Sequence, residues 1–362
     1  MKRVFNFGAG PAMLPTSVME KARDEFLDFK GLGAGLIEIS HRSKEFDAVI
    51  DRTDSLFREL SGLPENYKIL YVHGGAQMQF SAIPMNLIGR NPAHKAAYLE
   101  TGNFASLARK EASRYGNISV AATSEATNFD RIPAFDPASL DADTSYVHLT
   151  SNNTIFGTRW NKFPDTGSIP LVADMTSELL SRKLDFNQFG VIFAGLQKNL
   201  GPAGMALVLI REDLLGNALP YTPSLLDYSV YEKSHSLQNT NNTFAIYMMC
   251  LVMEWLKEQG GVGVIEERNE MKAKLIYDAI DSTDFYIGSA HTPDRSIMNA
   301  TFNIAQPELA DAFLKEADKQ GLYALKGHRL VGGIRASIYN AMPVEGCEQL
   351  VAFMKDFERR NG

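Results

Sequence analysis

Apolar runs of strand length alternate with segments of helical periodicity from residue 69 onward, and this alternation constrains the fold more than any other feature. Such runs, bounded by turn residues, are typical of strands buried in a parallel sheet, and the amphipathic segments between them are typical of helices that cover it. We therefore predict an α/β fold with a large, doubly wound domain around a mainly parallel sheet. The expected strands are Ile69–His73, Ala96–Glu100, Ser119–Ala122, Ser145–Leu149, Leu171–Asp174, Val191–Ala194 and Met205–Arg211.

A second, smaller α+β domain is predicted at the end of the chain. A long amphipathic helix at Thr243–Gln259 is followed by three glycines between residues 260 and 263, which break the helical pattern. A large domain over residues 16–262 and a small domain of residues 1–15 and 263–362 would each hold one core, since single cores stop growing at about 250–300 residues. The elements expected in the last hundred residues are a helix at Ile265–Ile280, a strand at Asn299–Ile304, a helix at Pro307–Gln320, a strand at Gly333–Ser337 and a helix at Val344–Arg359.

The charge and the cysteine content exclude several classes of function. The net charge is −7 and the basic residues are scattered, which argues against a nucleic-acid partner. Cys250 and Cys347 are too few for a disulfide framework or a zinc quartet, and both lie in helix-like patterns. Glycines and an asparagine interrupt the first ten residues, where a signal peptide needs an apolar stretch, and no apolar run approaches the ~20 residues of a membrane helix. We expect a cytoplasmic protein with no membrane or nucleic-acid partner.

The sequence also lacks the short motifs of several catalytic classes. Its seven histidines show no H-E-x-x-H spacing, and neither a G-x-S-x-G elbow nor a Walker A loop is present. The motifs therefore indicate no metal site, no serine nucleophile and no nucleoside-triphosphate chemistry.

Lys198 directly follows a predicted strand and precedes a loop rich in glycine and proline, in the segment AGLQKNLGPAG. Burying a lysine ammonium is costly, so a lysine between two buried strands indicates a chemical role such as a lowered pKa or a Schiff base. Asp174 ends the predicted strand LVAD upstream, and a carboxylate there could hold a pyridinium N–H. Either residue alone is a weak signal, but the pair favours a pyridoxal phosphate site at the carboxyl ends of the strands.

The turn after the first predicted strand could bind an anion. Gly74, Gly75 and Ala76 lead into a helix expected to start near Gln77. Small residues and the free N–H groups of a helix start suit a phosphate, although such turns also occur without a ligand. Phe104 follows the next strand, where its ring could stack on a planar cofactor or pack in the core.

The segment GLGAG at residues 31–35 looks like a dinucleotide-binding loop. It is expected to follow a helix and to precede a strand, which is the wrong order for that fingerprint. We interpret it as a helix stop.

Two segments pair histidine with arginine. SHRSKEF contains His41 and Arg42, and KGHRLVGGIRASIYNA contains His328, Arg329 and the strand residue Arg335. His–Arg pairs suit a phosphate, and an arginine on a strand suits a carboxylate held by two hydrogen bonds. A surface ion pair is the alternative for each of them, and it is the stronger one for Arg329 taken alone.

Taken together, these motifs resemble those of the phosphoserine aminotransferase family, which belongs to the fold-type I, class V pyridoxal phosphate enzymes. The resemblance covers essentially the whole chain and includes FNFGAGPAMLP near the start and GHRLVGGIRASIYNAMP near the end. It implies that Lys198 forms the Schiff base with the cofactor and that Asp174 pairs with the pyridine nitrogen. It also implies that Phe104 stacks on the ring, where many relatives carry tryptophan, and that Thr154 donates to the phenolic oxygen.

The same resemblance implies a shared active site in a homodimer. Ala76, Gln77 and Gln197 would join the shell around the cofactor and its phosphate. The family takes an Asn-Thr pair from the neighbouring subunit, which corresponds here to Asn239 and Thr240.

The implied reaction is reversible transfer of an amino group between phosphoserine and 2-oxoglutarate, which gives 3-phosphohydroxypyruvate and glutamate in serine biosynthesis. Substrate contacts carry over to His41, Arg42, His328 and Arg329, and the contact to the α-carboxylate carries over to Arg335. Bacterial members also suggest 4-phosphohydroxy-L-threonine, an intermediate of pyridoxine biosynthesis, as a second substrate.

The chain departs from the family pattern at three places besides Phe104. Gln77 stands where some members have an arginine, Ala9 where some have a serine, and Asn241–Asn242 where many have two prolines. The first change removes an anion contact, which leaves the balance between phosphoserine and glutamate open.

Three alternatives have distinguishing features. Another class V aminotransferase could act on a different small amino acid, in which case the His–Arg pairs would not bind a phosphate. A cysteine desulfurase needs a mobile cysteine near the cofactor, whereas Cys250 and Cys347 lie in helical patterns. A regulator that only binds the cofactor would be expected to lack Lys198 or Asp174, and both are present.

Overall fold

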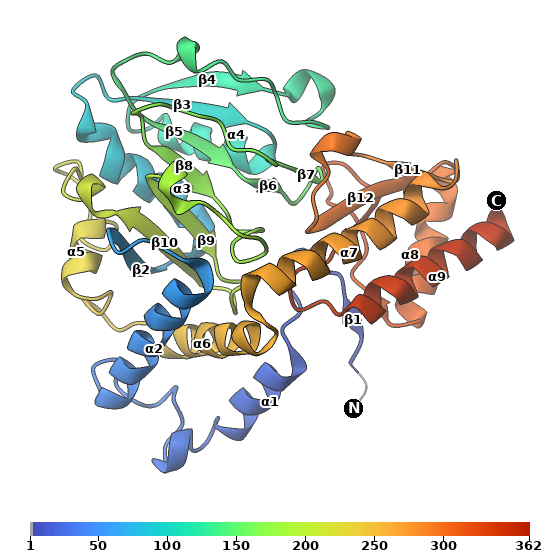
Figure 1. Ribbon diagram of the computed structural model, residues 1–362, viewed down its shortest axis with the longest axis horizontal. Coiled ribbons are helices and arrows are strands. Elements are labelled where there is room, and N and C mark those ends of the chain that lie inside the picture. The colour runs from blue at the N-terminus through green and yellow to red at the C-terminus, as the bar shows by residue number, and fades with distance from the viewer. Residues whose placement is uncertain (1–2) are drawn as a thin grey trace.

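A seven-stranded sheet forms the centre of the large lobe in the computed structural model, which describes residues 3–362 (Figure 1). Every predicted strand of this sheet is confirmed to within two residues at each end. Only β10 runs antiparallel to its neighbours, so the predicted, mainly parallel sheet is also confirmed. In spatial order the strands are β2 (Tyr67–His73), β10 (Met205–Arg211), β9 (Val191–Gly195), β8 (Leu171–Asp174), β5 (Thr144–Thr150), β3 (Lys95–Glu100) and β4 (Asn117–Thr123).

Helices cover both faces of this sheet, because successive strand residues point to opposite sides. In β10, Leu207 and Leu209 belong to the core that also contains α2 (Lys44–Ser61) and α6 (Thr243–Glu258). The alternate residues Ala206, Val208 and Ile210 belong to the opposite core, with α3 (Gly75–Leu87) and α4 (Asn103–Ala112). The short helix α1 (Thr16–Asp24) packs against α6. The central strands β5, β8, β9 and β10 are therefore buried on both faces, as their continuous apolar runs predicted, whereas the edge strand β4 is largely exposed.

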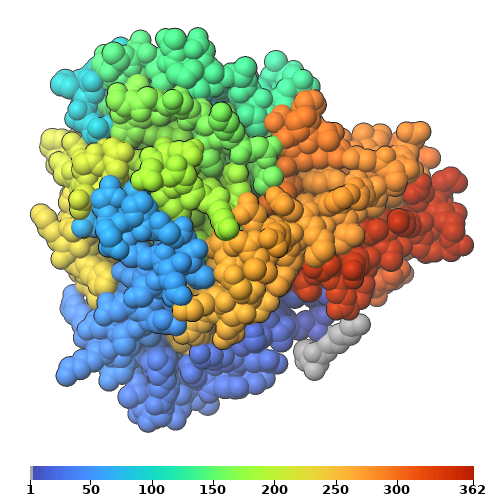
Figure 2. Space-filling model, in the orientation of Figure 1, coloured from blue at the N-terminus to red at the C-terminus, as the bar shows by residue number. Residues whose placement is uncertain are grey.

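The small lobe lies beside the large lobe (Figure 2), and it holds a second core. An antiparallel sheet packs here against helices of the last hundred residues, and the predicted strands and helices of this region are confirmed. Phe7 joins this core, and the segment around it pairs β1 (Phe5–Asn6) with β13 (Leu322–Tyr323). The other elements are β11 (Tyr286–Gly288), β12 (Asn299–Ile304), β14 (Ile334–Ser337), α8 (Ala310–Lys319) and α9 (Val344–Asn361).

The helix α7 (Gly261–Asp281) spans both lobes (Figure 1). Val262 and Ile265 contribute to the large core, whereas Ala273 and Ile276 contribute to the small core. The predicted break between two helices is confirmed, since α6 ends at Glu258, but the second helix begins at Gly261, four residues before the predicted start. Glycine is tolerated there because N–H groups of a first helical turn have no intrahelical partner. The predicted domain boundary falls inside this turn, and the division into domains stays a prediction.

The reading of residues 31–35 as a helix stop before a strand is also wrong. The preceding helix α1 ends at Asp24, and a 3₁₀ turn, η1 (Phe29–Gly31), lies between. No strand follows in the described structure until β2, and the next helix is α2. Gly31 and Gly33 have positive φ angles, so these glycines serve turns instead.

No helix among residues 3–362 is long and apolar enough to span a membrane.

Lys272 is a fully buried lysine on α7 that clamps the loop between β14 and α9. Its Nζ donates to the carbonyl oxygens of Ile338 at 3.0 Å, Tyr339 at 2.8 Å and Met342 at 3.1 Å. Burial lowers the pKa of Lys272 to about 7, whereas the three carbonyl acceptors favour its charged form. The clamp ties the loop to the helix that joins the two lobes.

We expect the substitution Lys272→Met to lower the free energy of unfolding by about 2–4 kcal/mol, because it leaves three buried carbonyls without a donor. Urea unfolding followed by circular dichroism measures this change. The control is Lys274→Met on the same helix, where an exposed lysine pairs with Asp278; it should change the free energy by less than about 0.5 kcal/mol. Equal effects of the two substitutions would contradict the clamp.

Candidate active site

A cavity of about 510 Å³ opens at the carboxyl ends of the parallel strands. The loops after β2, β3, β5, β8 and β9 converge on it, as predicted from the topology. The sequence-predicted residues that line this cavity are Ala76, Gln77, Phe104, Thr154, Asp174, Gln197, Lys198, His328 and Arg335.

Lys198 lies in the turn after β9 and is only 8% exposed. Its Nζ donates to the Thr154 hydroxyl at 2.5 Å and lies 5.7 Å from the centre of the Phe104 ring. Burial, which outweighs the opposing Asp174 charge and is assisted by the Arg335 charge, lowers the pKa of Lys198 to about 8. Roughly a tenth of this lysine is therefore a neutral amine at pH 7, far more than for a lysine with the ordinary pKa of 10.5.

Asp174 ends β8, and its carboxylate is buried beside the cavity. Burial raises the pKa of Asp174, while two hydrogen bonds from Thr176 and the Lys198 charge oppose that rise. Both Thr176 bonds, from its hydroxyl at 2.6 Å and from its backbone N–H at 3.0 Å, go to Oδ1. Within residues 3–362 no donor pairs with Oδ2, so this oxygen can accept from a ligand in the cavity.

The turn after β2 has the geometry expected of an anion site. Gly74 and Gly75 have φ angles of 85° and 67°, which favour glycine, and α3 begins at Gly75. The Gly74 N–H donates to the Gly204 carbonyl at 3.0 Å, which fixes the turn against a second glycine-rich loop. Ala76 and Gln77 therefore lie in a first helical turn at the cavity, where backbone N–H groups have no intrahelical acceptor.

Sequence reasoning missed several residues of the cavity wall. Thr176 follows Asp174 by two positions, a spacing at which a threonine can bond a turn carboxylate, and this signal could have been used. Asn152 and Ser177 also line the cavity and hydrogen bond to each other at 2.9 Å. Gly10 and Pro11 form part of the wall from the other end of the sequence, a long-range contact that no local pattern indicates.

Five predicted site residues do not line this cavity within the described chain. His41 precedes α2 and is buried, and no hydrogen-bond partner is found for its Nε2 in the described structure. Arg42 is exposed, as is Arg329 in the turn after His328. The two remaining residues are Asn239, whose amide nitrogen lies 3.3 Å from Nε2 of His73, and the exposed Thr240.

The two cysteines lie away from this cavity. Cys250 is buried in α6 and Cys347 in α9, as their patterns predicted. Burial raises the pKa of both thiols, that of Cys347 to about 12, which disfavours a nucleophilic thiolate. No cluster of metal-ligating side chains is found among residues 3–362.

Comparison with known proteins places this arrangement in a family. The family model described as aminotransferase class V matches residues 4–350. The curated phosphoserine aminotransferase of Nitrosomonas europaea is 49% identical over 369 aligned residues, which cover 100% of both chains, and that of Bacillus subtilis is 49% identical over 362 residues with the same coverage. This chain belongs to the phosphoserine aminotransferase family.

Solved structures of phosphoserine aminotransferases have the same fold as this chain. The enzyme from Bacillus circulans subsp. alkalophilus is 46% identical, covers 100% of both chains and has a TM-score of 0.96. A pyridoxal phosphate-bound phosphoserine aminotransferase from Trichomonas vaginalis is 36% identical, covers 98% of this chain and 100% of its own, and has a TM-score of 0.92. The expected fold class is confirmed over the full length.

The burial of Lys198 predicts that its amine reacts at a lower pH than that of an ordinary lysine. In cofactor-free protein, the pH dependence of Lys198 acetylation should have its midpoint near 8, below the ordinary lysine value of 10.5, because burial disfavours the ammonium. Competitive labelling at a series of pH values, followed by mass spectrometry, measures this midpoint.

The exposed Lys274, which pairs with Asp278, is the internal reference in the same samples. If the Lys198 midpoint equalled that of Lys274, burial would not lower the pKa of Lys198 as described.

Proposed function

We propose that this protein is a phosphoserine:2-oxoglutarate aminotransferase that uses pyridoxal phosphate. It transfers an amino group reversibly and interconverts phosphoserine and 2-oxoglutarate with 3-phosphohydroxypyruvate and glutamate, a step of serine biosynthesis. The observation that carries the proposal is the buried Lys198 amine, which shares one cavity with the buried Asp174 carboxylate.

The residues of the cavity fit this cofactor. Asp174 Oδ2 has room to accept from the pyridine N–H, and the charged carboxylate would keep that ring nitrogen protonated. Phe104 offers a ring face on the cavity wall, and the Thr154 hydroxyl, next to Lys198, can donate to the phenolic oxygen. The N–H groups at the start of α3 would bind the phosphate together with Gln197.

Pyridoxal phosphate, when bound, supplies the electron sink for the charge that develops when the substrate loses its Cα proton. Lys198 can move that proton because its pKa of about 8 lies near the operating pH. As a neutral amine its Nζ accepts the proton from Cα, and as an ammonium it returns a proton later in the reaction. The Thr176 hydroxyl holds the Asp174 carboxylate in place.

Recognition of the substrate requires two anion sites. Arg335 lines the cavity from the small lobe, is half-buried, and can bind the α-carboxylate with both arms of its guanidinium. His328 lines the same cavity. His328 and the adjacent Arg329 are proposed to bind the phosphate of phosphoserine or the γ-carboxylate of glutamate.

We propose that a second subunit completes this site. Asn239 and Thr240 lie outside the cavity of their own chain, and so do His41 and Arg42. The two segments are neighbours, since the Thr243 hydroxyl at the start of α6 donates to the carbonyl of Leu36 at 3.3 Å.

Exposed apolar side chains surround this region. They fall in the first helix and the loop after it, which Figure 1 shows projecting from the large lobe in blue. Such a patch favours a homodimer in which these residues reach the neighbouring cavity. The side chains are Met19 at 45%, Phe26 at 45%, Leu27 at 80%, Leu32 at 46% and Ile37 at 51% exposed.

The two cysteines are free and buried, which supports a reducing, cytoplasmic location.

The proposed substrate can be tested by steady-state turnover with 2-oxoglutarate as acceptor. We expect kcat/KM for phosphoserine to exceed that for serine and for alanine by at least about 100-fold, because these lack the charged group that the His–Arg pairs would bind. The same assay with 4-phosphohydroxy-L-threonine shows whether the site accepts the longer substrate. Equal or better turnover of alanine would favour a different class V aminotransferase.

The shared site predicts recovery of activity in hybrid dimers. Lys198→Ala and Thr240→Val should each be nearly inactive, whereas equal amounts unfolded and refolded together should recover about a quarter of the wild-type activity, since half of the dimers then contain one intact site. The matched control is Lys198→Ala with Asp174→Ala, which should recover none because both residues belong to one chain's cavity. Equal results for the two mixtures would contradict a shared site.

A further inference from the structure

The segment Ala9–Pro11 forms an outer wall over Lys198. All three of its residues line the cavity, and Gly10 and Pro11 are exposed on their other side. A Cβ atom placed on Gly10 would lie 3.5 Å from Cγ and 3.7 Å from Cε of Lys198, so the backbone of this segment covers the lysine side chain directly. The segment therefore covers one side of the Lys198 side chain.

Backbone hydrogen bonds fix the chain on either side of this wall, and one side chain, that of Tyr339, hydrogen bonds to the wall itself. The carbonyl of Phe7 accepts from Ser337 at 3.2 Å, and the N–H of Ala12 donates to Gln197 at 2.9 Å. Between these ties, the Tyr339 hydroxyl donates to the Ala9 carbonyl at 2.8 Å. In the part of the chain that the structure describes, this is the only hydrogen bond that joins residues 9–11 to the rest of the protein.

The Tyr339 hydroxyl is itself fixed by a buried polar chain that crosses between the lobes. Asn299 on β12 donates to it at 3.2 Å, and Asn299 also accepts from Asn152 of the cavity wall at 2.8 Å. All three side chains are nearly inaccessible to solvent. The Lys272 clamp fixes the backbone of Tyr339 from the other side. Because Tyr339 is fixed at both its hydroxyl and its backbone, it can hold the Ala9 carbonyl in one position.

We propose that Tyr339 is a positioning residue of the active site, whose hydroxyl holds the Ala9–Pro11 wall over Lys198 and thereby keeps the lysine amine out of water. Tyr339 does not line the cavity, so this role does not require the tyrosine to contact the cofactor. This inference rests on the proposed function only for the role of the Lys198 amine in catalysis.

The test is the acetylation midpoint of Lys198 in cofactor-free Tyr339→Phe, which removes the one hydroxyl and keeps the ring. With the wall released, water reaches Nζ and the ammonium becomes easier to form. The midpoint should then rise by about one pH unit or more, which corresponds to roughly tenfold less neutral amine at neutral pH. The charged and titratable groups that face Lys198 are Asp174 from β8, Arg335 from β14 and His328, and Tyr339→Phe substitutes none of them.

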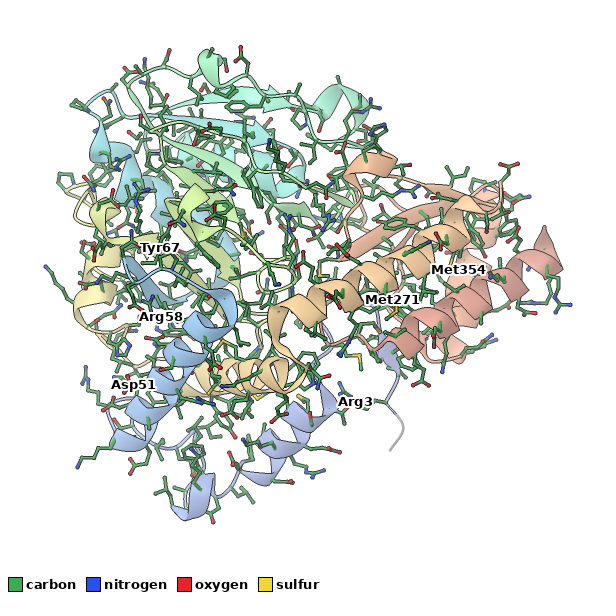
Figure 3. The ribbon with its side chains drawn as sticks, in the orientation of Figure 1. Arg3, Asp51, Arg58, Tyr67, Met271 and Met354 are labelled. Atoms are coloured by element: carbon green, nitrogen blue, oxygen red, sulfur yellow. The ribbon has the colours of Figure 1, made fainter. Side chains whose placement is uncertain are left out.

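The matched control is Tyr286→Phe, another buried tyrosine of the small lobe. Its hydroxyl donates to a backbone carbonyl at the same distance of 2.8 Å, that of Met354 on α9, which Figure 3 labels. This variant should lose comparable stability and leave the Lys198 midpoint at its wild-type value. Hydrogen exchange gives a second reading, since the Ala12 N–H should exchange faster in Tyr339→Phe than in Tyr286→Phe.

An unchanged Lys198 midpoint in Tyr339→Phe would overturn the proposal, and so would an equal rise in both variants, which would indicate general loosening. Because labelling is done without cofactor or substrate, either outcome is separate from a failure of the proposed function, which would appear as absence of phosphoserine turnover in the wild-type protein.

Discussion

Burial of the Lys198 amine is the constraint on which the rest of the structure depends. Moving a lysine ammonium out of water is costly, and the protein meets this cost partly by favouring the neutral form and partly by placing a hydroxyl and a carboxylate nearby. The Asp174 carboxylate is buried as well, and Thr176 compensates part of its lost hydration. A folded protein tolerates such a pair where its chemistry requires it, and strongly shifted groups in one cavity are typical of active sites.

The fold brings these groups together from distant parts of the sequence. Parallel strands end at the same edge of the sheet, so the turns that carry Asp174 and Lys198 open into one crevice. The small lobe adds Arg335 from a strand of a different sheet, and the helix α7 links the lobes through both cores. The buried polar chain from Asn152 through Asn299 to Tyr339 gives the lobe boundary a defined geometry, because each of its amide groups needs its partners.

Much of this arrangement could be predicted from the sequence, and the reasons for success and failure are physical. The central strands are buried on both faces and are continuous apolar runs, which made their positions predictable to within two residues. Lys198 and Asp174 could be predicted as site residues because both lie at the ends of predicted strands. The start of the helix after Gly260 was predicted too late because a first helical turn tolerates Gly261 and Gly263. The segment GLGAG was predicted to stop a helix, whereas its glycines serve turns well after α1 has ended. The wall formed by Gly10 and the tether from Tyr339 depend on contacts across the whole chain, which no local pattern reveals.

The most direct test of the central claim is the visible absorbance of the purified protein with pyridoxal phosphate, titrated with phosphoserine and separately with alanine. We predict an absorbance band from the condensed cofactor that phosphoserine discharges, that 2-oxoglutarate restores and that alanine leaves unchanged, whereas Lys198→Ala cannot complete this cycle. Absence of the band in the wild-type protein, or its equal discharge by alanine, would contradict the assignment of Lys198 and of the anion sites around it.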